Sequence, residues 1–200
     1  MSFKTKSDPQ YLELPEAELV YYDRFFDDKE SKRLMRGLID HIHWKHEEII
    51  IFGRRVLQPR LTAFYGDAHK SYSYSNITLK PHPWNEDLNF IRQRIENVSG
   101  YQFTSVLLNY YRDGQDSMGW HSDNEKELGT NPVIASVSFG ESRKFMLKHK
   151  REKHLKSSII LNNGSFLLMK GPTQHHWNHQ IPKTKNPMGA RVNLTFRKIL

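Results

Sequence analysis

The segment 191–197, which reads RVNLTFR, restricts the fold of this chain more than any other stretch. Polar and apolar residues alternate along it, and the side chains of a β-strand alternate between two faces with a period of two. One face is therefore apolar and suited to anchor the strand in a core. The opposite face carries the polar residues Arg191, Asn193, Thr195 and Arg197. We expect a strand that holds two guanidinium groups on one side.

The two arginines of this strand indicate what it binds. A guanidinium group can donate two parallel hydrogen bonds to a carboxylate. At this spacing, Arg191 and Arg197 can hold a small dicarboxylate at both of its ends. From this segment alone, a solvated basic strand is an equally good interpretation.

A second pattern, His121-Ser122-Asp123 followed far downstream by His179, is typical of a metal site. Two His and one carboxylate form the facial triad of non-haem Fe(II) oxygenases, which leaves three coordination positions open. An H-x-D pair alone is a weak signal in a chain with 11 His. Its combination with the strand 191–197 is stronger, because 2-oxoglutarate chelates the iron and needs a partner for its far carboxylate.

With these motifs the sequence resembles the AlkB family of Fe(II)- and 2-oxoglutarate-dependent nucleic-acid dealkylases, from about Tyr21 to Leu200. The similarity is closest to the branch that repairs double-stranded DNA. Besides the segments above, it rests on the motifs Pro59-Arg60, Tyr65-Gly66-Asp67, Asn109-Tyr110-Tyr111 and Ala135-Ser136-Val137-Ser138-Phe139-Gly140. The resemblance selects His179 as the third metal ligand over the neighbouring His175 and His176.

The order of the expected elements predicts an α+β chain. Asp27 and Glu30 predict a capping box for a helix over 28–42, and a second amphipathic helix starts at Pro83 and ends before Gly100. Short strands are expected at 19–22, 49–52, 103–111, 133–139, 144–149, 159–161, 165–169, 175–180 and 191–198. The resemblance implies a double-stranded β-helix, or jelly roll, with the helices packed on one sheet.

A single domain is expected. At 200 residues the chain is long enough for one domain with its own core, and no linker or internal repeat divides it. We expect a flexible N-terminal tail over 1–12 and one AlkB-like domain over 13–200. The resemblance places a nucleotide-recognition lid within this domain, at about 45–80.

Composition narrows the partners and the chemistry. The net charge of +8, from 30 Lys and Arg against 22 Asp and Glu, favours a polyanionic partner such as nucleic acid. The sequence has no Cys, no long apolar span and no apolar signal core at its start, so we expect neither disulfides nor a membrane span. We expect an intracellular monomer, cytoplasmic if bacterial and nuclear if eukaryotic, that acts on alkylated DNA, with RNA as the alternative.

The resemblance assigns residues to three cofactors and co-substrates, namely Fe(II), 2-oxoglutarate and O2. The implied iron ligands are His121, Asp123 and His179. Arg191 would pair with the distal carboxylate of 2-oxoglutarate, and Arg197 would lie near the carboxylate next to the metal. Further hydrogen bonds to the co-substrate would come from Asn109, Tyr111 and Asn193. From the residues alone, Tyr111 reads as an ordinary core aromatic.

The implied substrate is a cationic base such as 1-methyladenine or 3-methylcytosine. Such a base cannot pair normally, so extruding it from a duplex costs less. An aromatic face and a nearby carboxylate suit its charge. The positions that match the family's substrate site are Arg60, Tyr72, Tyr74 and Glu125. Without the resemblance, Tyr72-Ser73-Tyr74 reads as a half-buried strand with two surface tyrosines.

Phe52, Gly53 and Arg54 are further predicted substrate contacts. Phe52 at a turn before Gly53 could fill the gap left by a flipped base, and Arg54 would lie where phosphates pass. The residues alone favour another interpretation, in which Phe52 ends a buried apolar run over 49–52. Two alternatives to a DNA dealkylase also stay open, namely the same chemistry on RNA or protein, and a nucleic-acid-binding jelly roll that has lost catalysis.

Overall fold

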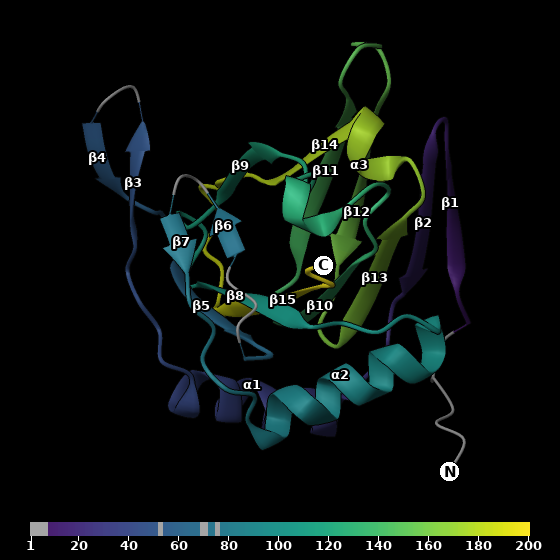
Figure 1. Ribbon diagram of the computed structural model, residues 1–200. Coiled ribbons are helices and arrows are strands. Elements are labelled where there is room, and N and C mark those ends of the chain that lie inside the picture. Colours follow the sequence, from purple (N-terminus) through teal and green to yellow (C-terminus); the bar gives the residue numbers. More distant parts are fainter. Residues whose placement is uncertain (1–7, 52–53, 69–71, 75–76) are drawn as a thin grey trace.

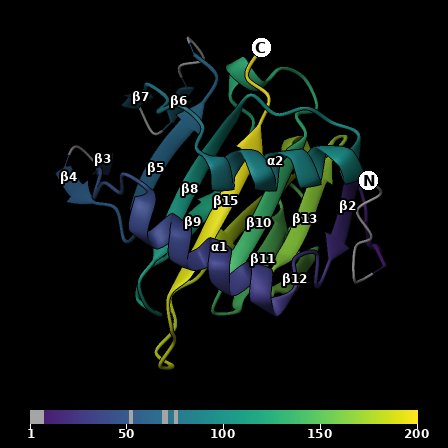
Figure 2. The ribbon, with the colours of Figure 1, turned by 90° about the horizontal axis from the view of Figure 1, so that it is seen from below.

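The computed structural model of the protein describes residues 8–51, 54–68, 72–74 and 77–200. It consists of two β-sheets that face each other, with two long helices on the outer side of the larger sheet (Figure 1). Figure 2, the view from below, shows both helices crossing that sheet. The predicted α+β jelly roll with helices on one sheet is therefore confirmed.

Within each of the two sheets, all neighbouring strands are antiparallel in the described part of the chain. The larger sheet has the strand order β1 (Gln10–Leu14), β2 (Ala17–Tyr22), β13 (Ser165–Lys170), β10 (Ile134–Gly140), β15 (Arg191–Arg197), β8 (Ser105–Tyr111) and β5 (Leu61–Gly66). The smaller sheet has the order β12 (Lys156–Leu161), β11 (Arg143–His149), β14 (Trp177–Ile181) and β9 (Met118–His121). Strands distant in sequence thus become neighbours in both sheets.

Two small hairpins lie within the predicted lid segment 45–80. The first pairs β3 (Glu48–Ile51) with β4 (Arg54–Leu57), and the second pairs β6 (Tyr72–Tyr74) with β7 (Ile77–Leu79). Both hairpins are separate two-stranded sheets rather than extensions of the main ones. The segment therefore has strand structure of its own on both sides of β5, and isolated bridges join β5 to Lys45 and to His82.

Each long helix begins and ends at a recognisable capping residue. Helix α1 (Asp28–His41) has the predicted capping box, in which the Asp27 carboxylate accepts from the Glu30 N–H and the Glu30 carboxylate accepts from the Asp27 N–H. Helix α2 (Glu86–Ser99) is capped by Asn85, so its start is three residues later than the Pro83 start we predicted. It ends at Gly100, whose φ of 75° is one that residues with a Cβ rarely adopt.

The core has two layers. One cluster packs both helices against the outer face of the larger sheet and includes Leu34 and Leu38 of α1 with Ile91 and Ile95 of α2. The other cluster fills the space between the two sheets.

Within the described part of the chain, no helix is long and apolar enough to span a membrane.

Strand β15 divides its side chains between these layers as its alternation predicts. The apolar residues Val192, Leu194 and Phe196 are fully buried in the cluster beneath the helices. The polar residues Arg191, Asn193, Thr195 and Arg197 line a cavity between the sheets. The apolar face therefore fixes the strand, and the polar face is presented to the interior of the jelly roll.

Three expectations about the elements are wrong in part. Residues 10–12 are not a loose tail, because they belong to β1, which pairs with β2 and places Leu12 and Leu14 against the core between the sheets. Residues 175 and 176 are not in a strand, because they end the one-turn helix α3 (Thr173–His176). Strands β4, β5, β7 and β9 were not expected. The short 3-10 helix η1 (Lys126–Leu128) completes the elements.

Candidate metal centre

The smaller sheet brings the three predicted metal ligands together. His121 ends β9, and its Cα lies opposite that of His179 in β14. Asp123 follows β9 after one intervening residue. The possible ligand atoms of the three side chains lie within 4.8 Å of one another, and the two imidazole centroids are 4.3 Å apart. The pairing of β9 with β14 therefore assembles the cluster.

Asp123 is held in place from both its side chain and its backbone. Its Oδ1 accepts a 2.6 Å hydrogen bond from Nη2 of Arg197, and its backbone N–H donates to Oε1 of Gln174 at 2.9 Å. The side chain is 1% exposed, and burial alone would raise its pKa. The charge and hydrogen bond of Arg197, together with the contributions of His179 and His121, outweigh burial and hold the pKa of Asp123 well below its usual value. At neutral pH the residue is a carboxylate, which is the form that binds a metal.

Both histidines can turn a lone pair to the centre. Nδ1 of His121 lies 2.9 Å from the Gly119 carbonyl oxygen, which can only accept, so Nδ1 carries a proton, and in the neutral ring Nε2 keeps a free lone pair. Burial, together with the nearby His121, lowers the pKa of His179 to about 3, although Asp123 acts in the opposite direction. Nε2 of His179 is 3.6 Å from Oδ2 of Asp123. The donor set is thus two neutral imidazoles and one carboxylate, which suits Fe(II) with open coordination positions.

Arg191 lies on the same cavity and is a buried cation in need of a partner. It is 1% exposed, and its Nη2 donates to Oγ of Ser138 at 3.0 Å. Its Nε and Nη1 are buried and have no hydrogen-bond partner among the described residues. Burial, only partly offset by Tyr111, lowers its pKa to about 10, so it is still charged at neutral pH. A buried guanidinium with free donors is costly unless an anion binds it, so the site fits a carboxylate.

All eight residues predicted to bind the metal or 2-oxoglutarate line one cavity. They are Asn109, Tyr111, His121, Asp123, His179, Arg191, Asn193 and Arg197. Tyr111 and Asn109 of β8 lie opposite Arg191 and Asn193 of β15, so the two strands present them as cross-strand pairs. The predicted metal and co-substrate residues therefore form one contiguous surface.

Two residues support the cavity in ways that only the folded chain reveals. Arg60 is buried, and its Nε donates to Oδ1 of Asn109 at 2.7 Å, so it orients a residue of the cavity wall. Gln174 of α3 is fully buried and accepts the backbone N–H of Asp123. Arg60 was expected to contact the substrate. Gln174 was not singled out, because a lone glutamine beside His175 carries no sequence signal.

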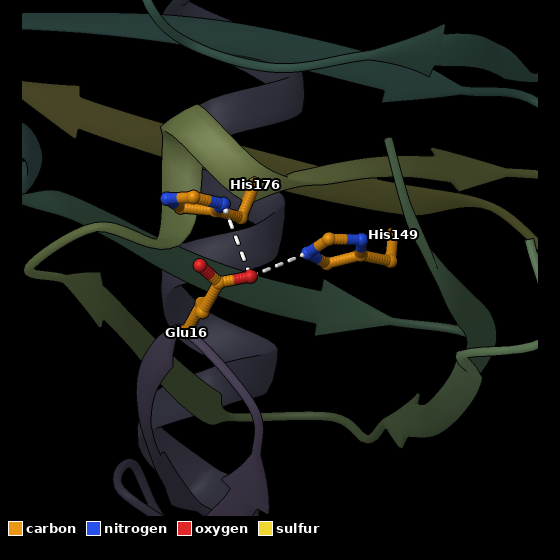
Figure 3. Close-up of side chains that lie close together, drawn as sticks. All are labelled: Glu16, His149 and His176. Carbon is orange, nitrogen blue, oxygen red and sulfur yellow. Dashed lines mark hydrogen bonds and ion pairs between the residues drawn. The ribbon is translucent and has the colours of Figure 1, made fainter. Parts of the chain in front are cut away.

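A second group of two histidines and a carboxylate lies elsewhere, at the tip of the β1–β2 hairpin (Figure 3). The Glu16 carboxylate is 3.0 Å from Nε2 of His149 and 3.2 Å from Nδ1 of His176. Nδ1 of His149 accepts from the backbone N–H groups of Arg151 and Glu152, at 3.3 and 2.9 Å. Nε2 of a neutral His149 must then carry the proton, so that atom donates to Glu16 and has no lone pair for a metal.

All the predicted substrate residues except Glu125 belong to the predicted lid segment 45–80. Phe52 and Gly53 fall outside the described residues. Arg54 begins β4 and is exposed. Tyr72 and Tyr74 begin and end β6, whose backbone pairs with β7. Glu125, half-buried, precedes η1 two residues after Asp123.

Comparison with known proteins gives a consistent family. The family model described as the 2OG-Fe(II) oxygenase superfamily matches residues 18–197. The chain is 44% identical over 189 residues to the DNA oxidative demethylase ALKBH2 of Homo sapiens, which covers 90% of this chain and 72% of that protein. It is 40% identical over 192 residues to the alpha-ketoglutarate-dependent dioxygenase alkB homolog 3 of Homo sapiens, which covers 92% of this chain.

The similarity extends over only part of some relatives. The chain spans 66% of the human alkB homolog 3 and 64% of that of Rattus norvegicus. The solved structure of OsALKBH1 superposes with a TM-score of 0.67 at 17% identity and covers 96% of this chain and all of that one. At that identity the superposition supports the fold alone.

Proposed function

Because the chain belongs to the 2OG-Fe(II) oxygenase superfamily and, within it, to the AlkB family, we propose that it removes alkyl groups from nucleic-acid bases by oxidation. The observation that carries this proposal is the single cavity in which the His-Asp-His cluster faces the unpaired donors of Arg191. A nucleic-acid-binding jelly roll without catalysis would not need a His-Asp-His cluster and a buried arginine with unpaired donors in the same cavity.

The residues of the chain divide the work of holding the reactants. His121, Asp123 and His179 would hold Fe(II), and Arg191 would bind the distal carboxylate of 2-oxoglutarate. When bound, Fe(II), 2-oxoglutarate and O2 would supply the chemistry. It is the oxidative decarboxylation of 2-oxoglutarate to succinate and CO2, coupled to hydroxylation of an N-methyl group, whose carbon then leaves as formaldehyde. Arg197 keeps Asp123 ionised and places a positive charge beside the metal position. Arg60 would support the co-substrate site by orienting Asn109.

The substrate we propose is alkylated DNA, with 1-methyladenine and 3-methylcytosine as the lesions. Both bases are cationic, so a pocket with tyrosines and a carboxylate suits them. Tyr72 and Tyr74 of the β6 hairpin and Glu125 beside the metal centre would supply these groups. The net charge of +8 favours nucleic acid over protein, and DNA is favoured over RNA because a relative named above is a DNA oxidative demethylase.

The decisive test is succinate release from defined oligonucleotides. We expect turnover with 1-methyladenine in DNA, dependent on added Fe(II) and 2-oxoglutarate, and none above background with the unmethylated strand. Parallel reactions with alkylated single-stranded DNA, double-stranded DNA and RNA rank the substrates. His179→Ala should abolish the release, whereas His154→Ala, at an exposed histidine far from the cavity, should not. Release that does not depend on the methyl group would contradict the proposal.

The preference for duplex DNA rests on Phe52. A flipped base leaves a gap in the stack, and an aromatic ring inserted there recovers part of the unstacking cost of a few kcal/mol. Phe52→Ala should therefore reduce repair of double-stranded DNA much more than repair of single-stranded DNA. Equal loss on both, together with a drop in stability of about 3–5 kcal/mol, would identify Phe52 as a core residue instead.

A further inference from the structure

The outer face of the smaller sheet is basic and carries no acidic residue. Its four strands, β9, β11, β12 and β14, contain neither Asp nor Glu. Along β11 the buried and more exposed positions alternate, so Lys144 and Lys148 point away from the cavity. Lys156 of β12 points to the same side, because it lies directly opposite Lys148. Three lysines therefore share a surface that has no charge to balance them within the sheet.

This arrangement of lysines is unfavourable in the isolated protein. Like charges directly opposite each other on neighbouring strands destabilise a sheet. Among the described residues, none of the ion pairs involves Lys144, Lys148 or Lys156. A bound polyanion would remove the repulsion and release counterions as it binds. The charge of the face thus matches a phosphodiester backbone.

An exposed tryptophan lies on the same face. Trp120 of β9 is 37% exposed, and Nζ of Lys148 lies 4.3 Å from its ring centroid. An aromatic ring next to cations is the combination by which proteins hold single nucleic-acid strands, because bases of any sequence stack on the ring while phosphates contact the cations. Trp120 with Lys148 therefore offers places for one base and one phosphate.

The position of Trp120 connects this face to the metal centre. Trp120 directly precedes His121, whose side chain lines the cavity, whereas the ring of Trp120 contacts Lys148 on the outer side. β9 is the last strand of its sheet, and its other edge pairs with no strand in the described part of the chain (Figure 1). A strand whose target base enters the cavity can therefore continue around this edge onto the outer face.

We propose that Trp120, Lys144, Lys148 and Lys156 bind the nucleic-acid strand that flanks the target base. One flanking base stacks on Trp120, and the lysines contact the phosphates that follow. This inference rests on the proposed nucleic-acid substrate and extends it from the target base to its neighbours. It commits to nucleic acid rather than to an anionic membrane or an acidic protein, because Trp120 adds a stacking surface to the charge.

The test compares long and short substrates that carry the same lesion. With a 1-methyladenine oligonucleotide of about ten nucleotides, Trp120→Ala should raise KM about fivefold or more while kcat and the dependence on 2-oxoglutarate are unchanged. Trp120→Phe should restore most of the affinity. With a trinucleotide substrate, wild type and Trp120→Ala should have the same KM. Tyr101→Ala is the matched control, because Tyr101 is also 37% exposed but follows α2, away from this face.

The lysines are tested by salt dependence. Each phosphate contact that is lost should reduce the slope of log K against log salt by about 0.7–0.9. Replacing Lys148 and Lys156 together by Ala should therefore reduce the slope by about 1.4–1.8. The same double change at Lys29 and Lys32, which are exposed on α1, should leave the slope unaltered.

The possible failures are distinguishable. If wild-type protein repairs the long oligonucleotide and the variants have the same KM and salt slope, the face does not bind the flanking strand and the proposed function still stands. If wild type repairs no nucleic acid, the proposed function fails, and the part of the tryptophan fluorescence that Trp120→Phe removes still tests the face, through its quenching by an undamaged oligonucleotide. No quenching overturns the inference. The inference is also overturned if the variants bind DNA normally but lose binding to phosphatidylserine vesicles.

Discussion

Among the residues that the structure describes, two clusters contain two histidines and a carboxylate, and they differ in the ligand atoms that their hydrogen bonds leave free for a metal. In each, the candidate ligand atoms lie within 4.8 Å of one another. In the cavity cluster, Nδ1 of His121 donates to a carbonyl oxygen, which leaves Nε2 free. In the hairpin cluster, Nδ1 of His149 accepts from two backbone N–H groups, which forces the proton onto Nε2. The two clusters are alike in composition, but the hydrogen bonds of His121 and His149 favour opposite tautomers.

The carboxylates of the two clusters also differ, in their burial and in the groups that hold them. Asp123 is buried, held by Arg197 and fixed at its backbone by Gln174. Glu16 is 53% exposed in its side chain, and among the described residues it pairs with the two histidines alone. Metal ligands in proteins are oriented by the groups behind them, and these groups decide whether a cluster is a site. Proximity of ligand types is therefore a weaker criterion than the direction of each hydrogen bond.

The largest effect should follow from removing each carboxylate in turn. Asp123→Ala should abolish Fe(II)-dependent turnover, because the centre loses its only anionic ligand, and the fold should persist since the ligands serve an open site rather than a structural one. Glu16→Ala should leave turnover and the bound-metal stoichiometry unchanged. Succinate release and Co(II) titration measure the two properties. Full activity of Asp123→Ala, or loss of one bound metal in Glu16→Ala, would reverse the roles of the two clusters.

This comparison also shows what the sequence can and cannot predict. The cavity cluster was predictable, because His121 and Asp123 are separated by one residue and the strand 191–197 alternates so regularly that its arginines must share a face. The β1–β2 hairpin was not, because Tyr11 is polar-tipped and exposed and leaves only Leu12 and Leu14 to indicate a strand. The hairpin cluster was equally hidden, since its members come together only when β1, β11 and α3 pack.

The second-largest effect should come from Arg191, the buried cation that lines the same cavity as the His121, Asp123 and His179 cluster. Arg191→Ala should raise the 2-oxoglutarate concentration needed for half-maximal turnover by about 10- to 150-fold, which corresponds to about 1.5–3 kcal/mol for a hydrogen bond to a charged group. Arg191→Lys should recover part of this loss, because it keeps the charge without the two-pronged geometry. Arg151→Ala, at an exposed arginine, is the control. An unchanged 2-oxoglutarate dependence in Arg191→Ala would show that another residue binds the distal carboxylate.

A comparable or smaller effect should come from the group behind Asp123. Gln174→Met keeps the volume of the buried side chain and removes the acceptor for the Asp123 N–H, together with the weak hydrogen bond that Nε2 donates to Sδ of Met169. Loss of an outer-shell hydrogen bond of this kind typically costs about 10- to 100-fold in metal affinity or activity. We therefore expect weaker Co(II) binding with an unchanged dependence on 2-oxoglutarate. Gln115→Met, at a glutamine that donates to the Thr184 carbonyl, is the matched control. Equal metal affinity in both variants would limit Gln174 to a packing role.

The smallest effect should come from the hairpin cluster itself. Glu16→Gln keeps an oxygen that can accept from Nε2 of His149 and removes the charge that faces His176. Because the Glu16 side chain is half exposed, the change should cost no more than about 1 kcal/mol of stability, or roughly 2–4 °C in melting temperature for a domain of this size. Turnover at saturating substrate should equal that of wild type. If Glu16→Gln instead impaired turnover as Gln174→Met does, the hairpin would act on Asp123 through α3, which carries both His176 and Gln174, and the two clusters would be one coupled unit.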